Sequence, residues 1–223
     1  MTDALLDRFL ATLSEPDPAA PRDRARAVGR DLIARWDEPH RRYHTRTHLI
    51  AVLDALDLLL AGPPRPDDPD ALRLAAWFHD AVYDGRPGDD EEASARLAER
   101  ALSGLGESPA RVAQVAALVR MTAGHAPSPD DVAGQLLADA DLAVLAAPEP
   151  EYRAYCAAVR LEYAHVPDAA FAVGRSQLLR RLAAGEWIYA TARGRALWEQ
   201  AARANLRTEL AGLDEQIRRA SGG

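Results

Sequence analysis

Apolar residues recur at helical spacing along most of the chain, and alanine, leucine and arginine fill almost every window. Runs of β-branched residues, which favour strands, are few. Clusters of proline, glycine and aspartate, such as GPPRPDDPD and DGRPGDD, interrupt the pattern and mark helix ends. The pattern predicts an all-α protein. Its helices are expected near residues 3–13, 22–36, 46–61, 70–83, 90–104, 109–123, 131–146, 149–164, 168–185 and 193–218.

No boundary between domains is visible in this pattern. A chain of 223 residues is long enough for one sizeable helical domain. Its apolar share of 48% and charged share of 27% are those of an ordinary globular protein. We therefore expect a single helical domain over 1–223, with 1–21 as a peripheral helix and linker. The tryptophans expected in its core are Trp36, Trp77, Trp187 and Trp198.

Charge excludes some partners and chemistries. The net charge is −7, and no basic cluster is long enough to neutralise several phosphates, so a nucleic-acid polymer is not the expected partner. A small phosphorylated metabolite remains compatible, because one or two arginines suffice to bind it. Lysine is absent, which excludes a P-loop lysine, a Schiff-base lysine and a pyridoxal-phosphate anchor.

The single cysteine and the short apolar runs indicate in which cellular compartment the protein is expected. Cys156 has no second cysteine to pair with, so neither an intrachain disulfide nor a cysteine zinc site can form. The N-terminus lacks the basic region and unbroken apolar stretch of a secretory signal. The longest apolar run is broken by Asp54 and Asp57 and is too short to cross a bilayer. We expect a cytoplasmic protein that does not enter membranes and acts alone or as a homodimer.

Histidines and acids interrupt apolar helices at three places. His48 precedes the run LIAVLDALDLLL, His79 and Asp80 adjoin in LAAWFHDAVYD, and Asp139 and Asp141 lie in QLLADADLAVL. Burying an ionised carboxylate beside an imidazole costs several kcal/mol unless a partner compensates, and a metal cation is a common partner. The acid-bearing runs are predicted as helix interiors, so a capping role is not expected. These positions are therefore candidate metal ligands.

In this order, His48, His79, Asp80 and Asp141 resemble the H…HD…D signature of the HD-domain superfamily of metal-dependent phosphohydrolases. The strings YHTRTHL, WFHDAVYD, DDEEAS, LADADLAVL, VRLEYAHV, FAVGRSQLL and ARANLRTEL are similar to those of a bacterial group of uncharacterised predicted HD phosphohydrolases. The resemblance covers roughly residue 25 to the end. It implies an all-helical, single-domain HD-type bundle, and in the family pattern Asp141 rather than Asp139 binds the metal.

Two imidazoles and two carboxylates form a mixed nitrogen and oxygen site. If positions stay open for water and substrate, such a site suits Mn, Co, Ni, Mg or Fe better than a closed structural zinc. We expect one divalent metal ion per chain. HD proteins with two metals often place an additional histidine between the dyad and the last aspartate, where this chain has His125.

Residues near the expected ligands are assigned further roles. His44 lies one helical turn before His48, where it contacts substrate or supports a ligand. His125, at a helix end, handles protons or merely lines the cleft. Glu91 lies after the dyad, where related nucleotide-cleaving HD enzymes place an acid that handles the attacking water or the leaving group. Alternatively, Glu91 and Glu92 only stabilise a helix N-terminus.

Arginines and the remaining histidines complete the candidates. Arg160, Arg175 and Arg181 lie in C-terminal strings that resemble the family, and Arg160 and Arg175 are the first candidates for a phosphate contact. Alternatively, these arginines are solvated or paired on helix faces. His40 and His165 are expected at the surface.

These expectations favour a hydrolase of a small phosphate ester, such as a nucleotide. The metal would activate a water that attacks phosphorus in line, while Asp80 orients it and Glu91 or His125 manages protons. One alternative is an HD-type iron-dependent oxygenase, whose relatives usually need two further histidines where this chain has only His125. Another is a non-catalytic ligand-binding protein that has kept the fold.

Overall fold

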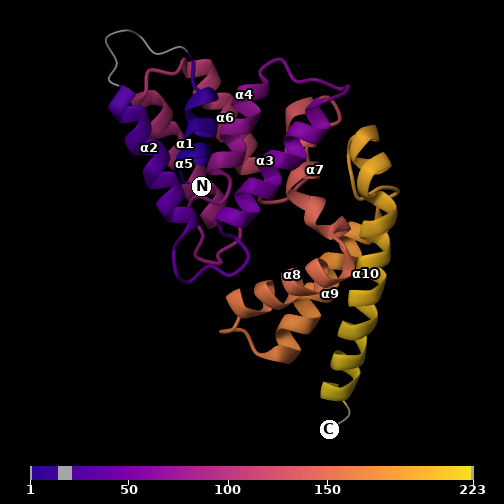
Figure 1. Ribbon diagram of the computed structural model, residues 1–223. Helices are drawn as coiled ribbons and strands as arrows, with labels where there is room; N and C mark the ends of the chain where they lie inside the picture. Colours follow the sequence, from indigo (N-terminus) through magenta and orange to yellow (C-terminus); the bar gives the residue numbers. More distant parts are fainter. Residues whose placement is uncertain (1, 15–21, 222–223) are drawn as a thin grey trace. The chain divides into compact units, whose positions relative to one another are not determined.

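The computed structural model describes residues 2–14 and 22–221, and all regular secondary structure in these ranges is helical (Figure 1). The all-α prediction is confirmed. The helices are α1 (Thr2–Ala11), α2 (Arg22–Trp36), α3 (Arg46–Leu60), α4 (Pro69–Phe78), α5 (Asp89–Gly104), α6 (Pro109–Met121), α7 (Val132–Asp141), the 3-10 helix η1 (Leu142–Ala146), α8 (Glu149–Glu162), α9 (Asp168–Ala184) and α10 (Ala192–Ser221).

The chain divides into two compact units, 1–140 and 141–223. The division falls at the last residue of α7, where the sequence pattern shows no interruption. A single domain over 1–223 therefore stays a prediction. None of the helices in the described part of the chain combines the length and apolarity needed to cross a membrane.

The first unit is built around α3 and α4. In α3 the buried Leu49, Val52, Leu53 and Leu56 follow helical spacing and form one continuous apolar face. Helix α4 begins where Asp68 accepts hydrogen bonds from two first-turn amides, and Trp77 and Phe78 near its end are fully buried. Helices α5 and α6 pack against each other, and both pack on α4.

Helix α1, expected at the periphery, also supplies core residues. Phe9 is fully buried and its ring meets that of Trp77 edge-on, with centroids 5.3 Å apart. Leu5 and Leu6 are buried beside it on the same face. The expected linker falls partly outside the described residues, at 15–21.

Two helices end earlier than their sequence pattern predicts. The helix expected over 70–83 stops at Phe78, so His79 is its C-terminal cap and Asp80 follows in a turn. The helix expected over 131–146 ends at Asp141 and continues as the 3-10 helix η1. The prediction that the acid-bearing runs are helix interiors is therefore wrong for His79, Asp80 and Asp141.

Tertiary hydrogen bonds explain the early end of α4. Ser94 on α5 accepts a hydrogen bond from the Val82 amide at 3.0 Å, and its hydroxyl lies 3.3 Å from the Val82 carbonyl oxygen. The buried Arg41 donates to the carbonyl oxygens of Asp80 and Ala81. Because these side chains satisfy main-chain groups that a longer helix would have paired, the chain leaves the helix without burying unsatisfied groups.

The second unit has its own core, which η1 and α8 to α10 enclose. Its buried residues are Leu145, Tyr152, Ala172, Leu179, Tyr189, Ala202, Leu206 and Leu213. Trp198 packs against this core, but Trp187 is 47% exposed and its ring lies 5.2 Å below the Arg195 guanidinium. The core prediction for Trp187 is wrong, because the residue falls in the turn between α9 and α10.

Glu107, between α5 and α6, anchors the end of α1 through a buried polar network. Its carboxylate accepts hydrogen bonds from the Ser14 amide at 2.8 Å, the Ser14 hydroxyl at 2.7 Å and Arg111 at 2.8 Å. Burial raises the pKa of Glu107, but the hydrogen bonds from Arg111 and Ser14 outweigh it and hold the pKa below its ordinary value of 4.5. The network therefore stabilises the first unit most when this carboxylate is ionised.

We expect Glu107→Gln to lower the free energy of unfolding by about 2 kcal/mol near neutral pH. This loss is smaller than the loss expected on breaking a fully buried ion pair, because Arg111 keeps Asp68 as a partner. Because the folded pKa lies below the unfolded one, the carboxylate contributes fully above pH 4.5. That contribution is lost as the pH falls through the folded value. Urea unfolding should therefore show a smaller difference between the two proteins at about pH 3 than at about pH 7. An equal difference at both pH values would contradict this role of the charge.

Candidate metal centre

Three side chains that could hold a metal ion converge at the ends of three helices. His48 lies in the first turn of α3, His79 caps the end of α4, and Asp141 is the last residue of α7. One ligand atom from each of the three lies within 4.8 Å of the others. His48 and His79 are 5% and 1% exposed, so both imidazoles are removed from water.

The imidazoles are oriented for coordination. Nδ1 of His79 lies 2.8 Å from the carbonyl oxygen of Ala76, which can only accept, so Nδ1 carries the proton. In the neutral ring Nε2 of His79 then presents a lone pair, and it lies 3.3 Å from Nε2 of His48. A main-chain carbonyl behind a metal-binding histidine is the usual way to hold such a ring and its tautomer. The arrangement therefore suits a cation in front of the two Nε2 atoms.

The carboxylate of Asp80 faces the same nitrogens. Its Oδ2 atom lies 3.2 Å from Nε2 of His79 and 3.9 Å from Nε2 of His48, and its side chain is 15% exposed. The structure thus brings Asp80 to the two histidines that group with Asp141. Two imidazole nitrogens with carboxylate oxygens form a donor set that fits a divalent metal ion. A partly exposed carboxylate at such a centre could also orient a water.

Aromatic rings surround the two buried imidazoles. The Trp36 ring lies 5.3 Å from that of His79 and 6.1 Å from that of His48, between centroids. Tyr43 packs at 4.7 Å from His48 on the same measure. This apolar shell lowers the local dielectric, which makes a compensating cation more valuable to the carboxylates.

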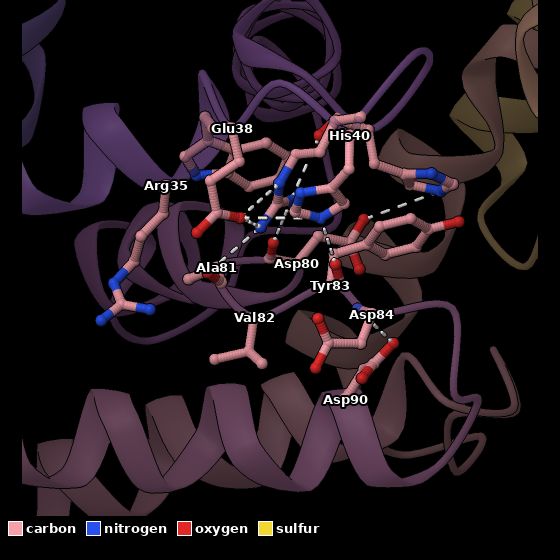
Figure 2. Close-up of polar contacts among 12 residues, drawn as sticks. Arg35, Glu38, His40, Asp80, Ala81, Val82, Tyr83, Asp84 and Asp90 are labelled. Atoms are coloured by element: carbon pink, nitrogen blue, oxygen red, sulfur yellow. Dashed lines mark hydrogen bonds and ion pairs between the residues drawn. The ribbon is translucent and has the colours of Figure 1, made fainter. Parts of the chain in front are cut away.

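His44 also reaches this cluster. Its Nε2 lies 3.9 Å from Oδ2 of Asp80, and its ring stacks on that of Tyr83 with centroids 4.1 Å apart. The structure therefore places His44 at the edge of the candidate centre, while its contact with substrate stays a prediction. His40 and His165 are exposed, as predicted. His40 nevertheless donates a hydrogen bond from Nε2 to the Tyr83 carbonyl oxygen at 2.8 Å (Figure 2).

Arg41 and Asp90 support this region and were not predicted. The Arg41 side chain is 0% exposed, and it donates to main-chain oxygens on both sides of the cluster. Asp90, in the first turn of α5, accepts a hydrogen bond from the Asp84 amide at 3.0 Å (Figure 2). It also accepts one from the Arg86 amide at 2.8 Å and so holds the loop after the dyad. The sequence does not distinguish these two residues from their neighbours. Arg41 is followed by a second arginine, and Asp90 is one of four consecutive acids.

Glu91 and Glu92 have structural partners at the start of α5. Glu91 accepts a hydrogen bond from the Gly88 amide at 2.5 Å, which closes the first turn of the helix. Hydrogen bonds from Arg120 and then Arg96 hold the pKa of Glu92 at about 2. These contacts match the alternative that both acids stabilise a helix N-terminus, and a catalytic role for Glu91 stays a prediction.

Arg160 and Arg175 are also engaged within the second unit. Arg160 binds Asp168 and the carbonyl oxygens of Tyr163 and Val166, which joins the end of α8 to the start of α9. Arg175 is buried and donates to Glu209 at 2.8 Å. Their guanidinium groups therefore hold helices together, while the predicted phosphate contact remains untested.

The same buried network determines the state of the single cysteine. Burial and then the Glu209 carboxylate raise the pKa of Cys156 to about 12. Tyr152 and Cys156 both donate to Glu209, the latter at 3.3 Å. The thiol is therefore protonated near neutral pH, which argues against a nucleophilic cysteine.

His125 lies just after the end of α6, as predicted. Its backbone has a φ of 46°, and its amide donates to the Met121 carbonyl oxygen at 3.1 Å, so it closes the helix in a left-handed turn. Its proposed part in proton transfer is not visible in these contacts and stays a prediction.

A cavity of about 430 Å³ opens at the loop between α2 and α3. Its lining is Trp36, Asp37, Glu38, Pro39, Arg41, Arg42, Thr45, Arg46 and Thr47. Glu38 pairs with Arg41 and Asp37 pairs with Arg46, so acids balance two of its arginines.

Comparisons with protein-family models, with curated proteins and with solved structures yield no match to this chain. The candidate centre therefore rests on its own geometry, and membership of the HD superfamily stays a prediction from the quoted motifs.

Proposed function

We propose that this protein is a metal-dependent phosphohydrolase of the HD type that acts on a small phosphate ester such as a nucleotide. One observation carries the proposal: Nε2 atoms of two buried histidines lie 3.3 Å apart, and carboxylates lie within reach of both. A divalent cation would offset the cost of holding carboxylates beside two imidazoles that are almost completely removed from water.

His48, His79, Asp80 and Asp141 would hold one divalent ion of Mn, Co, Ni, Mg or Fe. A bound ion of this kind supplies a Lewis acid for a phosphoryl oxygen and makes water acidic near neutral pH. Asp80, whose carboxylate is 15% exposed and lies near both histidines, would orient the attacking water. His44, beside Asp80, would contact the substrate, and His125 would move a proton to or from it.

Metal analysis coupled to a phosphate-release screen tests this proposal. The protein is purified without added metal, its metal content is measured, and nucleotides and sugar phosphates are offered with Mn²⁺, Co²⁺, Ni²⁺ or Mg²⁺. We expect about one metal per chain and phosphate release that a chelator abolishes. Two irons per chain with oxygen consumption would support the oxygenase instead, and bound metal without any turnover would support the ligand-binding protein.

His125→Ala tests the expected single metal. If His125 only handles protons, the change should leave about one metal per chain and lower turnover by roughly 10² to 10⁴. Metal analysis and steady-state rates of the two proteins check this. A wild-type protein with two metals and a variant with one would show that His125 is itself a ligand.

A further inference from the structure

The side chain of Arg41 uses all its donors inside the first unit. A guanidinium has five N–H donors. In Arg41 the Nε and Nη2 atoms donate to Oε2 of Glu38 at 3.0 and 2.9 Å, and Nη2 also reaches the Ala81 carbonyl oxygen at 3.3 Å. Nη1 donates to the carbonyl oxygens of Asp80 and His44 at 2.7 and 3.2 Å. The side chain is 0% exposed, so water replaces none of these bonds.

These main-chain acceptors belong to the two segments that carry the candidate ligands. The His44 carbonyl lies in the loop that leads into α3 and His48, whereas the Asp80 and Ala81 carbonyls directly follow His79. One rigid, planar group thus joins the loop before His48 to a turn that lies 39 residues after Arg41 in sequence. Its bonds to Asp80 and Ala81 go to their main-chain oxygens and not to the Asp80 carboxylate.

Neighbouring contacts restrict the guanidinium further. It lies 5.5 Å from the ring centroids of both Trp36 and Tyr83, where cation–π attraction is favourable. Trp36 in turn contacts the ring of His79, and Tyr83 stacks on His44. The partners Glu38, Asp80, Ala81 and Tyr83 lie together in Figure 2. Arg41 therefore contacts the shell around the centre at several points.

We propose that Arg41 is a positioning residue of the metal centre: it sets the distance between the His48 segment and the His79–Asp80 turn and thereby the affinity for a divalent cation. This inference rests on the proposed function. Lysine at this position would keep the charge, but its three donors on one atom cannot span three carbonyl oxygens and a carboxylate. The turn at Asp80 would then relax away from α3.

Arg111 provides a matched control in the same unit. It is half-buried, with 11% of its side chain exposed, and it also makes five hydrogen bonds, to Asp68 twice and once each to Ser14, Glu107 and the Thr12 carbonyl. None of these partners is a candidate ligand. A purely structural role for Arg41 would make the two arginines equivalent.

The test titrates Mn²⁺ into the full-length chain after its metal has been removed with a chelator, and also measures thermal unfolding without metal. Both Arg41→Lys and Arg111→Lys should lower the unfolding temperature. Only Arg41→Lys should weaken Mn²⁺ binding, by about 10- to 100-fold, as loss of an outer-shell partner does elsewhere. Arg111→Lys should stay within about twofold of the wild type.

Glu38→Gln keeps the test decisive if Arg41→Lys does not fold. Glu38 is more exposed, at 37% of its side chain. Loss of its charge weakens the contact with Arg41 but keeps the arginine in place. We expect about fivefold weaker Mn²⁺ binding, below the effect of losing Arg41 itself. Unchanged binding in the folded variants, or equal weakening in Arg111→Lys, overturns the inference. A wild type that binds no divalent metal overturns the proposed function as well, whereas Mn²⁺ binding without phosphate release overturns the hydrolase alone.

Discussion

Replacing His79 with alanine is expected to abolish metal binding and phosphate release together. The residue presents Nε2 to His48 and Asp80 from a position that is 1% exposed, and the Ala76 carbonyl holds its ring in place. The methyl side chain of alanine has no atom that could replace Nε2 as a ligand. The metal affinity should fall by more than the roughly 100-fold that loss of an outer-shell partner costs.

Metal content after dialysis and the unfolding temperature with and without Mn²⁺ check this result. The rise in unfolding temperature that Mn²⁺ gives the wild type should disappear in the variant, because a ligand stabilises only a protein that binds it. His165→Ala is the control, since His165 is exposed on the second unit. A His79→Ala protein that keeps a full metal equivalent would contradict the assignment.

Asp141→Asn should also cost the metal, whereas Asp139→Asn should not. Two residues apart on α7, their side chains point roughly 200° from each other, so one of them at most faces the histidines. The structure groups Asp141 with His48 and His79, while Asp139 is 1% exposed within the helix. Asparagine keeps the shape of aspartate and removes its charge, so the comparison isolates the ligand charge.

The two asparagine variants control for each other. Asp139→Asn changes a more deeply buried carboxylate, so its unfolding temperature should fall at least as much as that of Asp141→Asn. Metal analysis should nevertheless show about one equivalent in Asp139→Asn and none in Asp141→Asn. The reverse pattern would transfer the ligand role to Asp139.

Local sequence determined the helices, because their signals act over a few residues. Asp68 and Pro69 open α4, Ser108 and Pro109 open α6, and both starts lie within a residue of their predicted positions. The long apolar stripe of α3 likewise needs no knowledge of its neighbours. The same signals misplace Trp187, because an aromatic residue in a turn carries no periodicity that reports its burial.

Partners distant in sequence decided where helices end and which charges are available. Local propensity would continue α4 past Phe78, but Ser94 and Arg41 satisfy the main-chain groups of the following turn. Arg175, which the sequence alone suggested as a phosphate contact, donates a hydrogen bond to Glu209. A hydrogen bond over tens of residues leaves no local trace, so such roles emerge only from the folded chain.

For the candidate centre, too, the sequence and the tertiary structure determine different features. The order and residue types of His48, His79, Asp80 and Asp141 were readable from sequence, since histidines and acids that interrupt apolar helices demand compensation. The convergence of His48, His79 and Asp141 within 4.8 Å depends on where α3 begins and where α4 and α7 end. Arg41 joins two of these segments. Sequence thus determined which donors the centre contains, and the tertiary structure decided that they meet, because distances between helices depend on packing and long-range hydrogen bonds rather than on spacing along the chain.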